Sequence, residues 1–181
     1  DNKLIVEHPE WYTQDENGQI VAPVADWTDV ADLNYEVPEL REYMKNALKF
    51  WVEEANIDGY RCDVAEMVPT DFWENVRKEL DKIKPVFMLA EAEHPPHHQK
   101  AFDMSYAWEM LHIMNEIAKG NKNALHIDSV LVKNKGRFPA NSYRMYFTTN
   151  HDENSWNGCA VKRLGEDALK AFTVLTFTLN G

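Results

Sequence analysis

The stretch from Ile57 to Ala65 constrains the fold more than any other part of the sequence. It reads as a short buried strand that ends on a charged pair, Arg61 and Asp63, and an amphipathic helix is predicted on either side of it. Helices that alternate with strands are typical of parallel α/β sheets. Because ligands bind at the carboxyl ends of such strands, we expect Arg61 and Asp63 to belong to a functional site.

The same alternation continues along most of the chain. Helical periodicity follows Pro38, Pro69 and Trp108, and it returns near the C-terminus. Apolar runs between these helices predict four strands, at residues 59–63, 86–90, 102–105 and 143–148. Right-handed crossovers would make the strands parallel. We therefore predict an α/β fold that forms a partial (β/α)8 barrel, since a complete one needs ~250 residues. A small open sheet is the alternative.

The N-terminal part of the chain lacks a sustained period. An Asn-Gly pair within it predicts a turn, and thus a small hairpin between residues 11–12 and 20–21. We accordingly divide the chain into an irregular segment, residues 1–37, which precedes the third barrel helix, and a partial catalytic barrel, residues 38–181.

Charge and hydropathy exclude several classes of partner. The formal net charge of −11 disfavours nucleic acids and anionic membranes, which need a basic surface. No apolar run approaches the ~20 residues that span a bilayer, and no signal peptide is predicted at the N-terminus. The buried strand is expected to hold Cys62 as a small apolar residue, and a disulfide with Cys159 stays open.

Three carboxylates follow three predicted strands: Asp63, Glu91 and Asp152. Their convergence at one face would suit glycoside hydrolysis with retention, in which one carboxylate attacks the anomeric carbon and another protonates the leaving oxygen. Arg61 lies two residues before Asp63, on the same face of the strand, and could hold it as an anion. His151 is a natural ligand for sugar hydroxyls.

Two other interpretations of the acids stay open. Three acids could hold magnesium for enolate formation, with His151 as the base. The positive charge of Arg61 beside the site disfavours a metal cation there. Alternatively, the acids form separate ion pairs or helix caps. The loop histidines His94, His97 and His98 fit no strong metal-binding pattern, so we expect a solvated loop and no metal site.

Three segments resemble the α-amylase superfamily of glycoside hydrolases in content, order and spacing. They are Gly59-Tyr60-Arg61-Cys62-Asp63, Leu89-Ala90-Glu91-Ala92 and Phe147-Thr148-Thr149-Asn150-His151-Asp152. The resemblance implies a (β/α)8 barrel that cleaves α-glucosidic bonds with retention. It implies Asp63 as the nucleophile, Glu91 as the acid/base and Asp152 as the transition-state stabiliser. The implied substrate-binding residues are Arg61, His151, Tyr60 and His94.

Two departures from the family pattern qualify the prediction. The family's Asp-x-x-x-Asn-His segment at the third strand is absent, so we expect an internal fragment holding about strands four to seven, which could be inactive alone or self-associate through exposed barrel edges. Glu66 and Met67 stand where many α-amylases carry Lys-His. Strict endo-action on starch is therefore not implied, and action on malto-oligosaccharides stays open.

The predicted substrate is an α-glucan or an oligosaccharide. An α-glucan transglycosylase with the same residues and a non-catalytic carbohydrate-binding remnant are the alternatives. The chemistry requires no cofactor, whereas the resemblance implies structural calcium in the full-length protein, with Asp32 as a candidate ligand. It also favours a secreted or periplasmic location, where glucan-degrading enzymes usually work.

Overall fold

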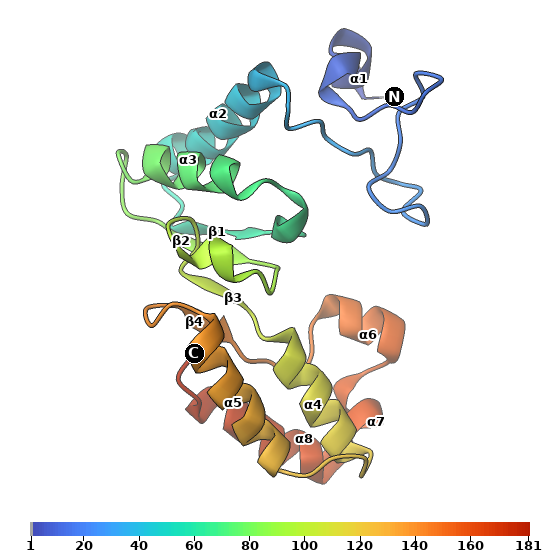
Figure 1. Ribbon diagram of the computed structural model, residues 1–181, viewed down its shortest axis with the longest axis vertical. Helices are drawn as coiled ribbons and strands as arrows, with labels where there is room; N and C mark the ends of the chain where they lie inside the picture. The colour runs from blue at the N-terminus through green and yellow to red at the C-terminus, as the bar shows by residue number, and fades with distance from the viewer. Residues whose placement is uncertain (1) are drawn as a thin grey trace. The chain divides into compact units, whose positions relative to one another are not determined.

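The computed structural model describes residues 2–181 and contains one parallel sheet flanked by helices (Figure 1). Its strands are β1 (Gly59–Cys62), β2 (Phe87–Ala90), β3 (Met104–Tyr106) and β4 (Tyr143–Met145). They lie in the order β1-β2-β3-β4, and every neighbouring pair is parallel. The predicted α/β class and the four strands are thus confirmed.

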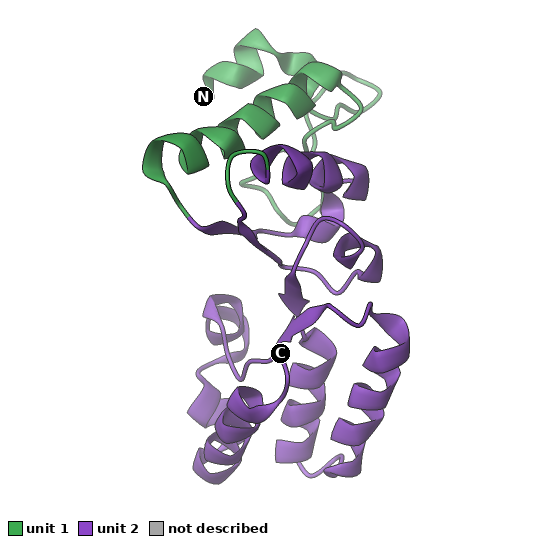
Figure 2. Cartoon of the chain, turned by 90° about the vertical axis from the view of Figure 1, so that its left-hand side faces the viewer, with its two compact units in different colours: residues 1–57, 82–84 green, residues 58–81, 85–181 purple. Residues whose placement is uncertain are grey.

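The described chain forms two compact units, coloured separately in Figure 2. Unit 1 contains residues 1–57 and 82–84, and unit 2 contains residues 58–81 and 85–181. This division does not test the boundary predicted after residue 37, which stays a prediction.

Unit 1 contains α1 (Lys3–Glu7), η1 (Pro9–Trp11) and α2 (Pro38–Ala55). Its core is built from Trp11, Tyr12 and Leu40. The predicted turn forms with Gly18 at φ 75°, and Gln14 pairs with Ile20. Tyr12, however, pairs with Leu33 and not with the 20–21 segment. Tyr12 belongs to the buried core of unit 1, and Leu33 packs against the same core, which explains why these two residues pair.

Unit 2 contains the sheet and the remaining helices. These are η2 (Ala65–Met67), α3 (Thr70–Leu80), η3 (Pro95–His98), α4 (Trp108–Ala118), α5 (Leu125–Arg137), α6 (His151–Asn157), α7 (Ala160–Leu164) and α8 (Glu166–Thr178). A single 3-10 turn, η3, joins β2 to β3 in the segment that was predicted to be a loop. The short helices α6 and α7 were not predicted, since five to seven residues are too few to show a period.

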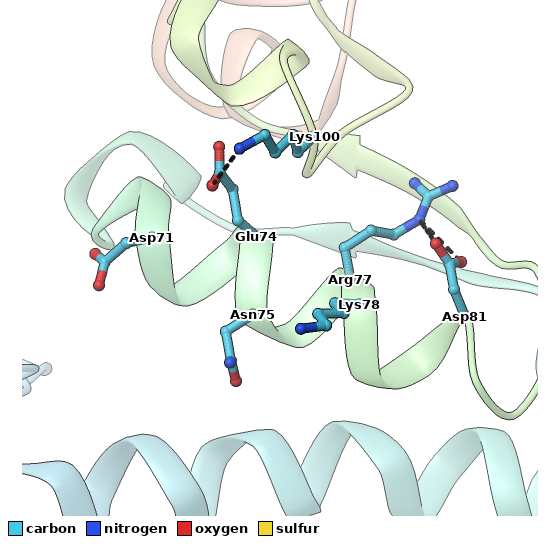
Figure 3. A pocket seen from close by; sticks show the side chains of 7 residues that line it. All are labelled: Asp71, Glu74, Asn75, Arg77, Lys78, Asp81 and Lys100. Atoms are coloured by element: carbon cyan, nitrogen blue, oxygen red, sulfur yellow. Dashed lines mark hydrogen bonds and ion pairs between the residues drawn. The ribbon is translucent and has the colours of Figure 1, made fainter.

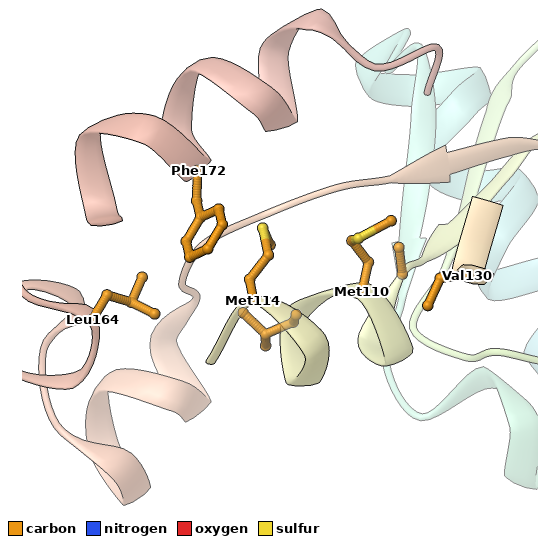
Figure 4. Close-up of a cluster of buried hydrophobic side chains, with 7 residues drawn as sticks. Met110, Met114, Val130, Leu164 and Phe172 are labelled. Carbon is orange, nitrogen blue, oxygen red and sulfur yellow. The ribbon is translucent and has the colours of Figure 1, made fainter. Parts of the chain in front are cut away.

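A cluster of apolar side chains holds the C-terminal helices of unit 2 together (Figure 4). Met110 and Met114 of α4 pack with Val130 of α5, Leu164 of α7 and Phe172 of α8. Burial of these side chains stabilises the unit by roughly 1.5–3 kcal/mol for each one fully buried.

Strands β1 and β2 approach each other unusually closely at Gly59. A Cβ atom at this position would lie 2.0 Å from the Phe87 carbonyl oxygen, so only glycine fits. The neighbouring helix α3 buries Trp73, whose indole N–H donates to the Ala65 carbonyl at 3.0 Å. These contacts position the segment that follows β1.

Both cysteines are free: Cys62 is buried, as predicted, and Cys159 is exposed. The open disulfide alternative is therefore not realised. In the part of the chain that the structure describes, no helix is long and apolar enough to cross a bilayer.

Candidate active site

Strand register brings Asp63 and Glu91 side by side. Cys62 is the partner of Ala90 in the β1–β2 ladder, and the Glu91 N–H donates to the Cys62 carbonyl at 3.0 Å. The ladder therefore continues one residue beyond each strand, and the two acids occupy equivalent positions at neighbouring carboxyl ends. The sequence predicted this placement.

One guanidinium group contacts both acids. Nη1 of Arg61 donates to the Asp63 carboxylate, and Nη2 lies 2.7 Å from Oε1 of Glu91. Burial opposes the charge of Arg61, but hydrogen bonds to Tyr106 and Asp63 and the charge of Glu91 together raise its pKa. The group therefore stays a cation and keeps the two carboxylates near each other.

The two carboxylates differ sharply in exposure. The Asp63 side chain is 74% exposed and that of Glu91 is 13% exposed. The second oxygen of Glu91 accepts the Val64 N–H at 2.9 Å. Val64 has φ 41°, which is rare for a β-branched residue and turns its amide toward Glu91. Asp63 is thus open to a ligand, whereas Glu91 is held by fixed donors.

Tyr106 completes this end of the sheet and was missed by sequence reasoning. Its hydroxyl accepts from Arg61 Nε at 3.2 Å, and its ring stacks on Trp108 with the centroids 5.5 Å apart. Because Ala90 pairs with Ser105, Tyr106 follows at the level of Glu91. The predicted strand ended one residue too early, at residue 105, and so left Tyr106 out.

A buried polar network lies behind these residues. Arg144 of β4 contacts Glu93 Oε1 at 2.5 Å and donates to the Ser105 hydroxyl at 2.5 Å. Burial raises the pKa of Glu93, an effect that the nearby Arg144 charge opposes. His98 Nε2 lies 2.6 Å from the same hydroxyl. This network ties the loop after β2 to β3 and β4.

Asp152 and His151 occupy a different setting, at the start of α6. His151 Nε2 lies 3.3 Å from Asp152 Oδ2, and the two side chains are 72% and 43% exposed. Asn150 caps the helix by accepting the Glu153 N–H at 2.8 Å. In residues 2–181, no hydrogen bond or ion pair joins Asp152 to the Arg61 group.

Arg163 of α7 holds the segment that carries Asp152. It donates to the carbonyl oxygens of Thr148, at 3.1 Å, and Gly158, at 3.5 Å, which flank α6. It also lies 3.5 Å from Oε2 of Glu153, and these two side chains are only 9% and 11% exposed. Asn115 accepts from it at 2.7 Å. Arg163 therefore restrains both ends of α6.

The two other predicted substrate ligands have less direct positions. Side chains alternate along a strand, so Tyr60 lies on the opposite face of β1 from Arg61. His94 is partly exposed, and its Nδ1 lies 4.0 Å from Oε1 of Glu66. The predicted roles of Tyr60 and His94 stay predictions.

The expectation of a solvated histidine loop is wrong for two of its three histidines. His97 is 1% exposed and His98 is 4% exposed. His97 is held by Thr70 Oγ1 and by the Ala65 carbonyl, each at 3.0 Å. These hydrogen bonds pair both ring nitrogens of the buried His97, which explains why this part of the loop folds inward.

Within residues 2–181, no three His, Cys, Asp or Glu side chains converge as a candidate metal site.

Comparison with known proteins identifies the relatives of this chain. A model described as the alpha-amylase catalytic domain matches residues 5–181. The crystal structure of a noncanonic maltogenic alpha-amylase, AmyB, from Thermotoga neapolitana superposes with a TM-score of 0.88 at 36% identity, covering 100% of this chain and 41% of that one. The fold is therefore part of a (β/α)8 barrel, as predicted.

Two curated relatives agree with this result. Alpha-amylase MalA from Haloarcula japonica is 24% identical over 159 residues, which are 86% of this chain and 23% of the relative. Maltogenic alpha-amylase from Bacillus acidopullulyticus is 43% identical over 60 residues, 33% of this chain and 10% of the relative. The chain thus spans less than half the length of these relatives.

Proposed function

Because the chain belongs to the alpha-amylase catalytic-domain family, we propose that it supplies the catalytic acids of a retaining glycoside hydrolase. The substrates are α-glucans or malto-oligosaccharides, cleaved at α-glucosidic bonds. The observation that carries the proposal is the contact of one guanidinium, that of Arg61, with both Asp63 and Glu91 at neighbouring strand ends.

In the proposed mechanism, Asp63 is the nucleophile. Its exposed carboxylate attacks the anomeric carbon while the bond to the leaving oxygen breaks, and Glu91 gives that oxygen a proton. A covalent glycosyl ester on Asp63 results. Glu91, now ionised, takes a proton from water, the resulting hydroxide oxygen attacks the anomeric carbon, and Asp63 is released as a carboxylate.

Arg61 has a positioning and electrostatic role in this scheme. Its guanidinium donates a hydrogen bond to the carboxylate of Asp63 and so holds the nucleophile in place. Contact with Glu91 at 2.7 Å also fixes the second carboxylate relative to the first. Tyr106, which accepts from Nε of Arg61, orients the guanidinium plane.

Asp152 and His151 are proposed to act on the sugar and not on the other two acids. Both side chains are exposed or half-exposed at the start of α6, with hydrogen-bonding capacity directed to solvent. We propose that they bind sugar hydroxyls and that Asp152 stabilises the positive charge of the oxocarbenium-like transition state. Arg61, His94 and Tyr60 are the further proposed substrate contacts.

The remaining expectations are proposals about the full-length protein. Carboxylate chemistry of this kind requires no cofactor, and any calcium would be structural, with Asp32 as a candidate ligand. The outer strands β1 and β4 are the proposed edges for self-association. A secreted or periplasmic location would suit a glucan-degrading enzyme.

The test is product analysis of the full-length protein on maltoheptaose, with initial anomers followed by NMR. We expect shorter α-anomeric products, and Asp63→Asn should abolish them. Products longer than the substrate would instead indicate a transglycosylase. Glucan binding with no bond cleavage at all would indicate a carbohydrate-binding remnant and contradict the proposal.

A further inference from the structure

The segment that follows β2 carries Glu91, and strand pairing ends at that residue. The Glu91 N–H donates to the Cys62 carbonyl of β1 at 3.0 Å. Residues 92–94, which come next, belong to no helix or strand. Backbone pairing thus holds Glu91 from the side of β2 only, so the position of the segment that leaves it depends on side-chain contacts.

Glu93, two residues after Glu91, connects this segment to three other elements. Its Oε1 lies 2.5 Å from Nη2 of Arg144 on β4, and its Oε2 accepts the N–H of Glu109 on α4 at 3.1 Å. Its carbonyl oxygen accepts from Nη2 of Arg137, the last residue of α5, at 2.9 Å. Because only 19% of the Glu93 side chain is exposed, little water competes for these contacts. Glu93 therefore anchors the segment that carries Glu91.

The contact with α4 supplies a helix cap that the start of this helix lacks. Ala107 occupies the N-cap position of α4 and makes no side-chain hydrogen bond to the first N–H groups. The Glu93 carboxylate accepts one of these N–H groups, that of Glu109, and a negative charge is favourable at a helix N-terminus. The start of α4 and residues 91–94 are thereby fixed relative to each other.

Arg144 connects Glu93 to the guanidinium of Arg61. Its Nη2 also donates to the Tyr106 carbonyl at 2.6 Å, and the Tyr106 hydroxyl accepts from Nε of Arg61 at 3.2 Å. Arg61 in turn contacts both strand-end carboxylates. Arg144 is 4% exposed, and a buried cation needs a partner of opposite charge, which Glu93 supplies. A continuous chain of polar contacts therefore runs from Glu93 to the two strand-end acids.

A group of charged side chains along α3 provides a contrast (Figure 3). Arg77 donates to Asp81, at the end of the same helix, at 2.9 Å. Its Nη1 also donates to Asp103, the residue before β3, at 2.9 Å. These contacts hold α3 at the amino end of β3, whereas the Glu93 contacts lie beyond the carboxyl end of β2, where the strand-end acids lie. The α3 group is therefore a suitable source of control variants.

We propose that Glu93 is a positioning residue for Glu91, which it holds, together with Arg144, so that the Glu91 carboxyl group reaches the leaving oxygen. The inference rests on the proposed hydrolysis, in which Glu91 gives a proton to that oxygen while Asp63 attacks the anomeric carbon. Glu93 itself does not touch the sugar. Loss of Glu93 should slow proton transfer and leave the attack by Asp63 nearly unchanged.

The test compares two substrates with the full-length Glu93→Gln variant. Maltoheptaose needs a proton at its leaving oxygen, whereas the leaving group of an activated aryl glucoside departs without one. We expect kcat on maltoheptaose to fall by about tenfold to 10²-fold, while the rate of aryl release in the first turnover, measured by stopped flow, falls by less than about twofold. Equal losses on the two substrates, or no loss on either, would overturn the proposal.

Glu91→Gln separates this inference from the proposed function on which it rests. If Glu91 is the acid, Glu91→Gln should show the same difference between the two substrates, and a larger one. That difference in Glu91→Gln but not in Glu93→Gln would overturn the positioning role alone. Its absence in Glu91→Gln would overturn the proposed function and the positioning role together.

Glu109→Gln is the matched control for Glu93→Gln. The Glu109 carboxylate is also partly buried, at 29% exposure, and lies 2.7 Å from Nζ of Lys133 on α5. Glu109→Gln and Asp81→Asn each remove one charge from an ion pair and should leave both rates close to those of the wild type. A loss confined to maltoheptaose in either control would overturn the specific role of Glu93.

Arg137→Met is the second variant, for use if Glu93→Gln fails to fold. Arg137 is partly exposed, and its removal takes away only one of the three contacts of Glu93, the bond to the carbonyl oxygen. We expect a smaller loss on maltoheptaose than in Glu93→Gln, again with aryl release nearly unchanged. Unchanged kcat on maltoheptaose in a folded Arg137→Met protein would contradict the anchoring of this segment through Glu93.

Discussion

The end of β1–β2 and the start of α6 carry carboxylates in contrasting ways. Asp63 and Glu91 follow their strands directly and share the guanidinium of Arg61. Asp152 is separated from the end of β4 by a loop and sits on a short helix that Arg163 restrains from α7. Backbone pairing thus positions the first pair, and side-chain contacts position the third acid.

This difference indicates where each site should be fragile. The ladder beneath Asp63 and Glu91 is continuous, so a change in their side chains should alter chemistry with little effect on folding. Asp152 relies on the ion pair between Arg163 and Glu153, which is almost fully buried. Loss of one partner there should affect stability and substrate binding together.

The largest expected effect is on the strand-end pair. In the full-length protein, Asp63→Asn should lower kcat on maltoheptaose by on the order of 10⁴-fold or more, because no ester can form. Glu91→Gln should lower it by about 10²–10⁴-fold through loss of proton transfer. The melting temperature should change little, and steady-state kinetics with thermal scans would check both statements.

Glu91→Gln also offers a chemical control. An added small anion such as azide should restore turnover of an activated aryl glucoside, since that leaving group needs no proton and azide replaces water. Absence of rescue, with the protein folded and binding intact, would argue against the acid/base role of Glu91.

Removal of the shared cation should have the next largest effect. Arg61→Met leaves Glu91, which is 13% exposed, with only the Val64 N–H as donor. We expect kcat/KM to fall by about 10²-fold through misplaced carboxylates, and unfolding free energy to fall by about 1–3 kcal/mol. Arg61→Lys should recover little, because an ammonium cannot make the same forked contacts. Full activity in the Lys variant would show that only charge matters.

Loss of the contacts by which Arg163 restrains α6 should lower kcat/KM less than loss of Arg61 does. Arg163→Met should lower kcat/KM roughly tenfold, equal to about 1.4 kcal/mol. It should also lower the unfolding free energy by about 3 kcal/mol, because the buried Glu153 carboxylate loses its cation and keeps, among the described residues, only the Asn157 side chain as a donor. Adding Glu153→Gln should restore part of the stability but not the activity. The two quantities would be measured by urea unfolding and by kinetics on maltoheptaose.

Arg77→Met is the matched control for Arg163→Met. Arg77 is likewise a partly buried arginine in an ion pair, but it lies on α3 and contacts two carboxylates, those of Asp81 and Asp103. Arg77→Met should lower the free energy of unfolding. Its kcat/KM should change only as far as the larger unfolded fraction accounts for. Equal catalytic losses in the two variants would mean that α6 has no special restraint.

The last effect concerns pH and acts on stability, with no change expected in catalysis. Burial and, second, the positive charge of Arg144 lower the pKa of His98 to about 4. The unfolded chain therefore binds more protons between about pH 6.5 and 4, so unfolding free energy should be greatest above pH 6.5 and fall by up to about 3 kcal/mol toward pH 4. His98→Gln should flatten this dependence in urea unfolding at a series of pH values. If unfolding free energy depended on pH as strongly in this variant as in the wild type, the assignment of the effect to His98 would be contradicted.

Sequence reasoning predicted the parts of the molecule that follow from period and register. The helix α2 begins at Pro38, the four strands lie near their predicted ranges, and the placement of Asp63 beside Glu91 follows from strand ends. Tyr106 was missed because β3 was ended one residue early. Such a boundary depends on pairing with β4, which a single short run of residues does not reveal.

Other features depended on tertiary contacts. The burial of His97 and His98 arises from partners 27, 32 and 7 residues away in the chain, and polar loop composition gives no sign of it. The helix that carries Asp152 has too few residues to show a period. The restraint by Arg163 joins carbonyl groups on either side of that helix, so no local pattern could predict it.

The most direct test of the central claim is identification of the residue that becomes glycosylated. The full-length Glu91→Gln variant would be treated with a fluorinated α-glucosyl fluoride that forms the ester faster than it is hydrolysed, and the labelled peptide would be sequenced by mass spectrometry. We predict a single glucosyl label on Asp63. A label on Asp152 or on any other carboxylate would contradict the assignment of the strand-end pair.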